Sequence, residues 1–385
     1  MEDKKKVPKL RFPGFTDDWE QRKLGELFNF HYGDGNNNPS NGGKYPVFGA
    51  GGIQGGYTKY NAENSVIIGH MGDAGCVSWG EGKHFVTYNG TITKPKDEVF
   101  SAKFGYYLLL NMDLRKYRGG SGLPFLTYDM LTEMETKCSN SKIETQKIAD
   151  YFTHLDHLIT LHQRQLDNLK NLKKGCLQKM FPRYGETKPE LRFPGFTDDW
   201  KQRKLSEISD VRDGTHDSPS YINEGHPFVT SKNVKDGYIN YDDIQYISDE
   251  DFEAINKRSK VDINDILMGM IGTIGNLALI RTEPDFAIKN VALIKDTKQV
   301  WYMYLYHYLQ SPSTARQLLS GLDGGTQKFV SLKNIRELNI MVPSEAEQIK
   351  VGTFIETLDN LITLHQRELD ELNQFKKGML QQMFV

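Results

Sequence analysis

The sequence predicts an α+β fold: two domains with mixed β-sheets, separated by two long antiparallel α-helices that form a coiled-coil-like rod. Three observations predict it. The phrase LRFPGFTDDW occurs at residues 10–19 and again at 191–200. A long segment with heptad spacing also occurs twice, at 144–181 and 347–384. Between these repeats lie two divergent segments with short runs of β-branched and aromatic residues and many glycines. The chain is therefore predicted to be one plan used twice, with pseudo-two-fold symmetry.

The repeated phrase belongs to a longer match. PKLRFPGFTDDWEQRKLGEL (8–27) and PELRFPGFTDDWKQRKLSEI (189–208) differ at only four positions. Phe12, Phe15 and Trp19 of the first copy are expected to fasten the start of a variable domain to the helical rod, because large aromatic side chains bury much apolar area. By the same symmetry, the first copy of the phrase should lie near the end of the second helix.

The two long segments align without a gap at an offset of 203 residues. Their apolar positions recur at alternating steps of four and three, which is typical of a coiled-coil seam. At ~1.5 Å per residue, each helix would be about 57 Å long. A helix of that length with a wide apolar face needs a partner, and the other copy is the obvious one. The residues expected at the helix-pair interface are Leu155, Ile159, His162, Leu166, Leu169, Leu358, Ile362, His365, Leu369 and Leu372.

A second apolar ridge runs beside this seam and is left over for contact with another subunit. It comprises Leu158, Leu161, Leu172, Leu361, Leu364 and Phe375. The seam histidines, His162 and His365, stand in no H-x-x-x-H or H-E-x-x-H frame. They are expected to set the register of the helices or to be partly solvated polar residues of the seam, and no metal site is predicted.

The variable domains at 28–142 and 209–342 have strand-like runs with glycine-rich turns, which favours sheets. The offset between the copies rises from 181 at the phrase to 200 at the glycine blocks GHMGDAG (69–75) and GMIGTIG (269–275), so the second copy carries an insertion around 230–252. The glycine spacing indicates either tight bends or a backbone close to a ligand, and tight bends are the favoured interpretation.

Composition and motifs exclude several classes of protein. The formal charge of −2 argues against a surface coated with phosphate-binding lysines. The three cysteines form no C-x-x-C pair. MEDKKK is followed by no apolar stretch, so no signal peptide is predicted and a cytoplasmic location is expected. Signatures of P-loop enzymes, amino-methyltransferases and zinc deaminases are missing. DGTHDS (213–218) is expected to be a polar loop rather than a catalytic triad. These features favour a binding or scaffolding protein.

Two divergent domains, each followed by a near-identical long helix, resemble the specificity (S) subunit of type I restriction-modification systems. The residues that carry the resemblance are both copies of LRFPGFTDDW, SVIIGHMGDAGC with DILMGMIGTIGN, TQKFVSLKNIRELNIMVPS, and the LDxLITLHQRxLDxLxxxKKGxLQxMF helices. The resemblance covers nearly the whole chain. The implied parts are target recognition domain 1 (1–142), a central conserved helix (143–181), target recognition domain 2 (182–342, with a linker at 182–190) and a C-terminal conserved helix (343–385).

The resemblance also implies function and partners. Each recognition domain would read one half of a bipartite sequence in double-stranded DNA. The helices would set the spacer and dock two modification (M) methyltransferase subunits. Restriction (R) subunits would join the complex. The chain itself would be no enzyme and would hold no cofactor; S-adenosylmethionine would belong to the M subunits, and ATP and Mg to the R subunits. No membrane contact is expected.

Base readout favours Arg or Lys for guanine and Asn or Gln for adenine, whereas Ser, Thr and Tyr are more flexible. The candidate DNA-contacting residues are loop positions beside glycines or predicted strand ends. In the first domain they are His70, Asp73, Tyr88, Asn89, Arg118 and Ser121. In the second they are His216, Ser231, Lys232, Asn233, Thr273, Lys289, Asn290, Gln327 and Lys328. At each position a solvated loop residue is the alternative.

Two other functions stay open at this point. One is a free-standing bipartite DNA-binding protein without methyltransferase partners. The other is an enzyme with a scattered acidic site, such as a nuclease. The leftover apolar ridge favours the S subunit over the free-standing protein, because an exposed apolar ridge is usually covered by a partner protein.

Overall fold

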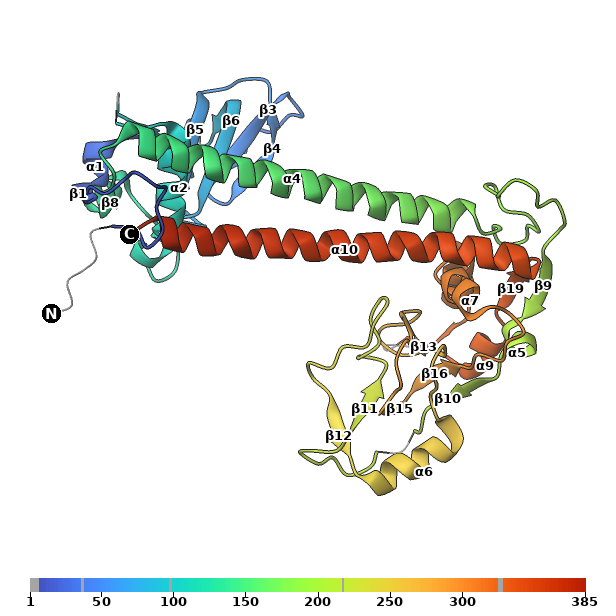
Figure 1. Ribbon diagram of the computed structural model, residues 1–385. Helices are drawn as coiled ribbons and strands as arrows, with labels where there is room; N and C mark the ends of the chain where they lie inside the picture. The colour runs from blue at the N-terminus through green and yellow to red at the C-terminus, as the bar shows by residue number, and fades with distance from the viewer. Residues whose placement is uncertain (1–6, 36–37, 97–98, 217, 325–327) are drawn as a thin grey trace. The chain divides into compact units, whose positions relative to one another are not determined.

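The computed structural model describes residues 7–35, 38–96, 99–216, 218–324 and 328–385 (Figure 1). The chain forms two compact units. Unit 1 comprises Met1–Arg164 and Arg367–Val385, and unit 2 comprises Gln165–Gln366. Two long helices, α4 (Lys142–Lys179) and α10 (Glu345–Met383), each contribute one part to each unit. No helix within the described ranges has an apolar stretch long enough to cross a membrane.

Unit 1 carries a mixed sheet in the strand order β2-β7-β5-β6-β3-β4. All neighbouring strands are antiparallel except β3 and β6, which are parallel. A small sheet pairs β1 with β8. The elements before the long helix are β1 (Glu20–Lys23), α1 (Leu24–Leu27), β2 (Phe28–Tyr32), β3 (Tyr45–Gly49), β4 (Gly52–Tyr57), β5 (Ala62–Gly69), β6 (Val77–Val86), β7 (Gly90–Pro95), α2 (Ala102–Asn111), the 3-10 helix η1 (Leu114–Tyr117), α3 (Tyr128–Glu133) and β8 (Glu135–Cys138).

Unit 2 follows a similar order, with the inserted helix α6, two strands in place of β6 and an added strand pair, β17 and β18. Its elements are β9 (Lys201–Lys204), α5 (Leu205–Ile208), β10 (Val211–Asp213), β11 (His226–Thr230), β12 (Gln245–Ile247), α6 (Asp249–Ser259), β13 (Ile266–Gly269), β14 (Leu277–Leu279), β15 (Ala287–Lys289), β16 (Val291–Ile294), α7 (Tyr302–Leu309), α8 (Pro312–Ser320), β17 (Leu322–Asp323), β18 (Phe329–Val330), α9 (Leu332–Arg336) and β19 (Asn339–Val342).

The sheet of unit 2 is divided where the sheet of unit 1 is continuous. In unit 1 the long strand β6 pairs with both β5 and β3. In unit 2 its counterpart is split: β14 joins the sheet β10-β16-β13-β14, whereas β15 joins the sheet β12-β11-β15. The segment RTEPDF (281–286) separates the two pieces, and Pro284 within it cannot donate a backbone hydrogen bond to a neighbouring strand.

The first copy of the repeated phrase is fastened to both long helices within unit 1. The Leu10 amide donates to the carbonyl of Gln382 on α10, 3.0 Å away. The Arg11 guanidinium makes a bidentate contact with Glu144 in the first turn of α4, at 2.6 and 2.8 Å. The Trp19 indole donates to the same carboxylate at 3.3 Å. Glu144 is fully buried, and its position in the first turn of a helix also suits a negative charge.

The second copy makes the same contacts within unit 2. The Leu191 amide donates to the carbonyl of Lys179 on α4, 2.7 Å away. Arg192 makes a bidentate contact with Glu347 of α10 at 2.7 and 2.8 Å, and Trp200 donates to that carboxylate at 3.1 Å. The expected attachment of the phrase to the helices is therefore confirmed. Its aromatic residues contribute, but the sequence argument did not identify the arginine–glutamate pairs.

The two long helices run antiparallel within each unit, as predicted. In unit 1, Asp156 of α4 pairs with Lys376 of α10, Oδ1 to Nζ, at 2.5 Å, and His162 Nδ1 lies 3.4 Å from Glu368 Oε2. In unit 2, Lys173 of α4 pairs with Asp359 of α10 at 2.7 Å. In unit 1 a rise in residue number along α4 accompanies a fall along α10. The predicted class, two sheet-bearing units and two long antiparallel helices, is confirmed.

The seam positions are shielded from solvent to different degrees. The buried ones are Leu155, Leu166, Leu358 and Leu369. The half-buried ones are Ile159, His162, Leu169, Ile362, His365 and Leu372.

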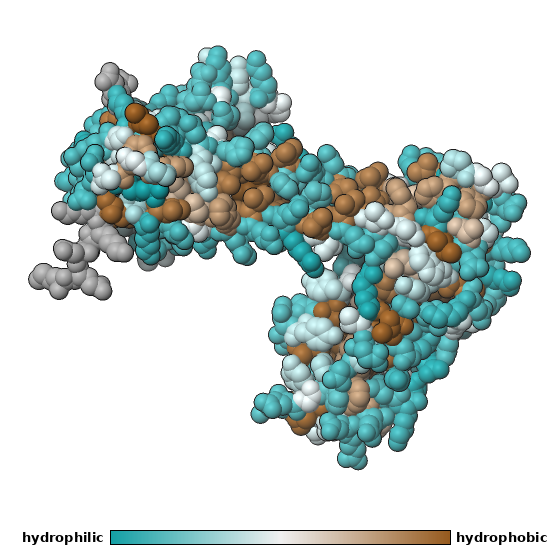
Figure 2. All heavy atoms as spheres, viewed as in Figure 1, coloured by the Kyte–Doolittle hydropathy of each residue, from teal (hydrophilic) through white to brown (hydrophobic). Residues whose placement is uncertain are grey.

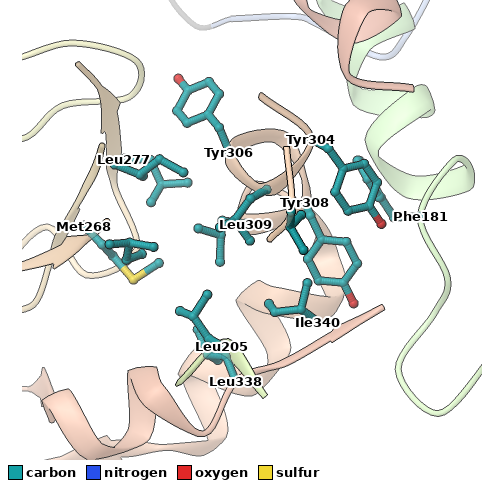
Figure 3. Close-up of a cluster of buried hydrophobic side chains, with 14 of the residues drawn as sticks. Phe181, Leu205, Met268, Leu277, Tyr304, Tyr306, Tyr308, Leu309, Leu338 and Ile340 are labelled. Atoms are coloured by element: carbon teal, nitrogen blue, oxygen red, sulfur yellow. The ribbon is translucent and has the colours of Figure 1, made fainter. Parts of the chain in front are cut away.

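The core of each unit joins the variable domain to the long helices. Figure 3 shows part of the core of unit 2, in which Phe181, just after α4, faces Tyr304 and Tyr308 of α7. The ring centroids lie 5.8 and 5.3 Å apart. In unit 1 the equivalent residue, Phe384, packs against Phe104 of α2 at 5.6 Å. Aromatic pairs at these separations add to the apolar area that they bury.

A polar contact beside each core distinguishes the two units. In unit 1 the Tyr107 hydroxyl donates to Asp156 at 2.7 Å. At the offset of 200 residues, His307 takes the place of Tyr107 in unit 2. His307 is fully buried, and its Nε2 lies 3.5 Å from Glu356 Oε2. Arg281 pairs with the other oxygen of Glu356 at 2.9 Å.

The His307 contact is expected to make the stability of unit 2 sensitive to acid. Burial alone would raise the pKa of Glu356, but the contacts with His307 and Arg281 lower it to about 2. A lowered folded-state pKa stabilises the fold above the ordinary pKa of 4.5, and this stabilisation is lost as the pH falls from there towards 2. Glu356→Gln should therefore lower the free energy of unfolding by about 1–3 kcal/mol at neutral pH, allowing for solvent screening.

Urea unfolding at pH 7 and at pH 3 would check this. The difference in free energy of unfolding between wild type and Glu356→Gln should be smaller at the lower pH. Thr153→Ala alters the equivalent position of unit 1, which carries no carboxylate, and should leave the pH dependence as it is in wild type. An equal gap at both pH values would contradict the expectation.

Candidate nucleic-acid interface

Four loops of unit 1 meet at one place, which we call corner 1. The His70 amide donates to the carbonyl of Asn89 at 2.8 Å, and the Leu126 amide donates to the carbonyl of His70 at 2.9 Å. The Tyr88 amide donates to the carbonyl of Gly35 at 2.7 Å. These bonds tie together the loops that form corner 1, at residues 32–35, 70–75, 88–89 and 118–125.

Unit 2 builds the equivalent corner 2 with the same kinds of bonds. The Asn290 amide donates to the carbonyl of Thr215 at 3.3 Å, and the Val330 amide donates to the carbonyl of Met270 at 3.0 Å. Isolated bridges repeat as well: Met71 with Phe125, and Ile271 with Phe329. Corner 2 comprises residues 213–216, 270–275, 289–290 and 328–330.

The glycine blocks form tight turns at the two corners. Gly75 donates its amide to the carbonyl of Gly69 at 2.9 Å, and Gly275 does the same with Gly269 at 3.0 Å. Gly75 and Gly275 have φ values of +81° and +80°, which side chains other than glycine rarely tolerate. The spacing is thus accounted for by backbone geometry, as the favoured interpretation expected.

Corner 1 presents aromatic side chains. The Tyr32 ring lies 4.2 Å from the ring of His70, 4.7 Å from that of Tyr128 and 5.4 Å from that of Tyr88. Tyr88 and Tyr128 are 41% and 40% exposed, and Phe125 nearby is 37% exposed. Burial raises the pKa of Tyr32, so its hydroxyl stays protonated at neutral pH. The arrangement offers flat apolar surface together with phenolic hydroxyls.

The candidates predicted for the first domain gather at corner 1. His70 is buried, and its Nδ1 donates to the Leu126 carbonyl at 2.9 Å. Asp73 pairs with Arg115 at 2.8 Å. Arg118 and Ser121 lie exposed on the loop at 118–125. Their contact with DNA stays a prediction.

Corner 2 presents a chain of polar side chains at the equivalent place. His216 Nε2 lies 2.9 Å from Asp213 Oδ2, and His216 Nδ1 lies 2.7 Å from Asn290 Oδ1. Arg258, near the end of α6, pairs with the other oxygen of Asp213. Lys289 bonds to the Ser218 hydroxyl. The DGTHDS loop therefore joins Asp213 to His216, but its serine bonds to Lys289 instead of the histidine.

Two candidates of the second domain hold corner 2 together from within. Ser231 is 5% exposed; its hydroxyl accepts from the Met270 amide at 3.0 Å and donates to the Asn290 carbonyl. It is inserted between two groups whose counterparts in corner 1 bond directly. Asn233 is 4% exposed and accepts from the Thr230 amide at 2.9 Å. For both residues a contact with DNA stays a prediction.

The remaining candidates of the second domain lie on or beside corner 2. The Thr273 hydroxyl donates to the Ser231 carbonyl. Lys232 pairs with Asp243 at 2.9 Å, and Lys328 donates to the Gly324 carbonyl at 3.1 Å. Gln327 lies outside the described residues.

Sequence reasoning missed several members of the corners. These are Tyr32 and Phe125 of corner 1, with Tyr128 beside them, and Asp213 of corner 2, with Arg258 and Ser218 beside it. The DGTHDS motif was the one signal that pointed to Asp213 and Ser218. Arg258 carries no local signal, because it approaches Asp213 from a helix 45 residues further along the chain.

One group of residues in unit 2 has the donor types of a metal site, namely His307, Glu356 and Asp359. Each carboxylate already has a cationic partner: Arg281 for Glu356 and Lys173 for Asp359. The group balances its charge without a metal ion, and it fastens α7 to α10.

Comparisons with known proteins agree with this duplicated architecture. A curated relative, the MjaVIII type I restriction enzyme specificity subunit of Methanocaldococcus jannaschii, is 22% identical over 306 residues, covering 74% of this chain and 70% of that protein. The crystal structure of a type I restriction-modification S subunit from M. genitalium has a TM-score of 0.70 at 19% identity and covers 98% of this chain and 99% of that one. A structure concerning complex assembly of the type I restriction-modification system has a TM-score of 0.51 at 14% identity, covering 96% of this chain and 97% of that one.

The family evidence covers both copies of the plan. The family described as type I restriction modification DNA specificity domain matches residues 16–171 and again residues 197–374. Each match begins within a copy of the repeated phrase and ends within a long helix. The two matches span most of the chain, and the protein therefore belongs to the type I restriction modification DNA specificity domain family.

Proposed function

We propose that this chain is the DNA sequence-specificity subunit of a type I restriction-modification complex. Each unit reads one half of a bipartite target in double-stranded DNA through its corner, and the long helices set the spacer between the halves. The chain is not itself an enzyme, and the chemistry of the complex belongs to other subunits.

The observation that carries this proposal is the contrast between the two corners. Their loops are joined by the same kinds of backbone bonds, yet corner 1 presents tyrosines where corner 2 presents Asp213, His216 and Lys289. A constant framework with different side chains suits two readers of different base sequences. Side chains on rigidly held loops also keep the geometry that base contacts need.

The apolar ridge supports the proposal that partner subunits dock on the helices. Unit 1 presents Leu161 and Phe375 at 44% and 50% exposure, beside the half-buried Leu158. Unit 2 presents an equivalent patch of leucines, Leu172, Leu361 and Leu364, at 49%, 38% and 51% exposure. Figure 2 shows apolar side chains gathered over the long helices. We call the set Leu158, Leu161 and Phe375 the unit 1 patch, and the set Leu172, Leu361 and Leu364 the unit 2 patch.

Two equivalent patches suit two copies of one partner, and the proposed partners are two modification subunits. These would carry S-adenosylmethionine and methylate adenine. Restriction subunits would add ATP and Mg²⁺ chemistry. A free-standing DNA-binding protein is less favoured, because it would leave both patches in water.

Exchange of one reader tests the function. Replacing residues 209–342 with the corresponding segment of another family member should change one half of the methylated sequence and keep the other half and the spacer. Methylome sequencing of a strain that carries the chimera and its partner genes would show this.

The unexchanged chain in the same strain is the control. A change in both halves would contradict the model of two independent readers. Absence of any methylated bipartite sequence with the unexchanged chain, in the presence of the partner subunits, would contradict the proposed function itself.

A further inference from the structure

Corner 2 contains a continuous chain of polar contacts that corner 1 lacks. It runs from Arg258 to Asp213, from Asp213 to His216, and from His216 to Asn290. At the offset of 181 residues, Tyr32 and Gly35 of corner 1 take the places of Asp213 and His216. Asparagine alone is kept, as Asn89 in corner 1. The chain of contacts is therefore particular to the second reader, and it ends on a residue that both readers have.

The burial pattern indicates that this chain of polar contacts orients exposed side chains. The Asp213 side chain is 9% exposed, whereas His216 and Arg258 are 65% and 69% exposed. Removing a carboxylate from water costs free energy unless its oxygens are bonded. Here the two oxygens are bonded to two exposed side chains, so Asp213 fixes the direction of groups that would otherwise move freely at the surface.

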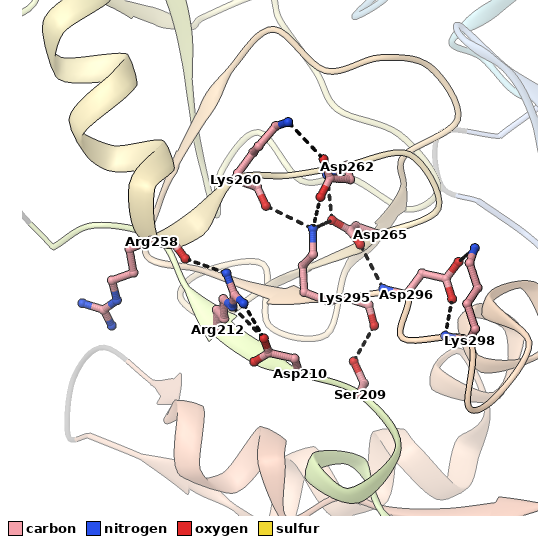
Figure 4. Close-up of polar contacts among 10 residues, drawn as sticks. All are labelled: Ser209, Asp210, Arg212, Arg258, Lys260, Asp262, Asp265, Lys295, Asp296 and Lys298. Carbon is pink, nitrogen blue, oxygen red and sulfur yellow. Dashed lines mark hydrogen bonds and ion pairs between the residues drawn. The ribbon is translucent and has the colours of Figure 1, made fainter.

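A second polar network holds the backbone at Arg258, where the chain of polar contacts begins (Figure 4). Arg212 donates to the Arg258 carbonyl at 3.0 Å and pairs with Asp210 at 2.6 Å. Lys295 donates to the Lys260 carbonyl at 3.2 Å. These bonds fasten the end of α6 to the strands β10 and β16. Arg258 thus approaches Asp213 from a fixed backbone.

The other end of the chain is equally well defined. Asn290 has a φ of +52°, a left-handed conformation that asparagine tolerates better than most residues. The Ser231 hydroxyl bonds to its carbonyl, and His216 lies at its side-chain oxygen. Among the residues that the structure describes, the Asn290 Nδ2 amide has no hydrogen-bond partner. A side-chain amide held in one orientation, with its donor group free, is prepared for a ligand that offers an acceptor.

We propose that Asn290 reads an adenine in the half-site of the second unit, with His216 as the residue that positions it. This inference rests on the proposed function and names the contact that the second reader makes. Asparagine meets adenine with two hydrogen bonds, donating to N7 and accepting from N6. Oδ1 has two lone pairs, so when both ring nitrogens of His216 carry protons, Nδ1 donates to one lone pair and adenine N6 donates to the other. Lys289, which precedes Asn290 in the chain and bonds to Ser218, and Arg258, which pairs with Asp213, carry positive charge suited to DNA phosphates.

The test measures binding of DNA by the chain in complex with its modification subunits. The probes are the target duplex from the methylome and a set of duplexes that each change one base pair of the half-site read by unit 2. Wild type should discriminate against replacement of one adenine by about 5- to 150-fold, the range for a bidentate contact. Asn290→Gly keeps the left-handed backbone and removes the amide, so it should lose discrimination at that position and retain it elsewhere.

A matched control is Asn264→Gly. Asn264 also has a left-handed backbone, with a φ of +73°, and it lies in the same unit outside corner 2. This variant should read every position as wild type does. His216→Ala should weaken discrimination at the adenine by about 2- to 12-fold, and His216→Gln, which keeps a donor, should restore part of it.

The outcomes separate the inference from the proposed function. Wild-type discrimination at every position by Asn290→Gly would overturn the inference and leave the function intact. Loss of discrimination at a position other than adenine, or an equal loss at all positions, would also overturn it. A uniform loss of affinity by His216→Ala would overturn the positioning role. A wild-type complex that prefers no half-site would instead refute the proposed function.

Discussion

Replacing Glu347 by alanine should lower the free energy of unfolding by about 3–5 kcal/mol, because it leaves one member of a buried ion pair without its partner. Glu347 is 1% exposed and accepts hydrogen bonds from Arg192 and Trp200. Without the carboxylate, the Arg192 guanidinium, which is only 15% exposed, loses its counter-charge, and the Trp200 indole loses its acceptor. Urea unfolding followed by circular dichroism would measure the loss.

The matched control is Glu345→Ala in the same first turn of α10. Glu345 is exposed and has no such contacts in the described part of the chain, so its loss should change stability by about 0.5 kcal/mol or less. The double variant Arg192→Met, Glu347→Leu should recover much of the loss, because apolar replacement of both partners leaves no unpaired charge. Equal effects of the two single alanine variants would contradict this account.

The equivalent pair in unit 1 predicts the pH dependence. Burial alone would raise the pKa of Glu144, but hydrogen bonds from Arg11 and Ser139 and the charge of Arg11 together lower it. The stabilisation is therefore complete above the ordinary glutamate pKa of 4.5 and is lost as the pH falls below it. The difference in free energy of unfolding between wild type and Glu144→Ala should therefore become smaller in acid. A constant difference down to pH 3 would contradict this.

Charging one apolar patch should remove one modification subunit from the complex. Leu361→Asp with Leu364→Asp places two carboxylates in the unit 2 patch, and burying them against a partner should weaken docking by about 2 kcal/mol or more, which is roughly 30-fold. Native mass spectrometry of the co-expressed complex should then show one modification subunit in place of two. The same pair of changes at Leu158 and Leu161 should affect the other copy.

Because Leu361 and Leu364 are 38% and 51% exposed in the chain alone, the unit 2 patch variant should keep the melting temperature of wild type. Asn171→Asp adds a charge at an exposed position of α4 that does not face the ridge, and it should leave both copies in place. Retention of two modification subunits after both patches are charged would refute docking on the ridge.

Local pattern was sufficient for the parts of the fold that repeat. The heptad spacing predicted helices that the structure places at Lys142–Lys179 and Glu345–Met383. The identity of LRFPGFTDDW in both copies predicted one shared attachment, because identical residues in equivalent surroundings make the same contacts. The glycine blocks predicted tight bends, since their left-handed backbone is available chiefly to glycine.

The division of the second sheet was harder to foresee. Mixed sheets were expected in both units, and unit 1 has a continuous six-stranded one. In unit 2 the segment at 281–286, which contains Pro284, lies between strands of two separate sheets. Strand pairing is set by partners far along the chain, so a run of β-branched residues indicates a strand without indicating its neighbour.

The sequence by itself therefore determined the duplicated plan, the long helices, the repeated attachment and the family. The tertiary structure alone decided the chemistry of each corner. It brought Tyr32, His70 and Tyr128 together in one unit, and Arg258, Asp213 and Asn290 in the other. Repeats and heptads are properties of neighbouring residues, which a sequence displays directly. The corners join residues from separate loops, and such contacts exist only after the sheets have closed the loops onto one another.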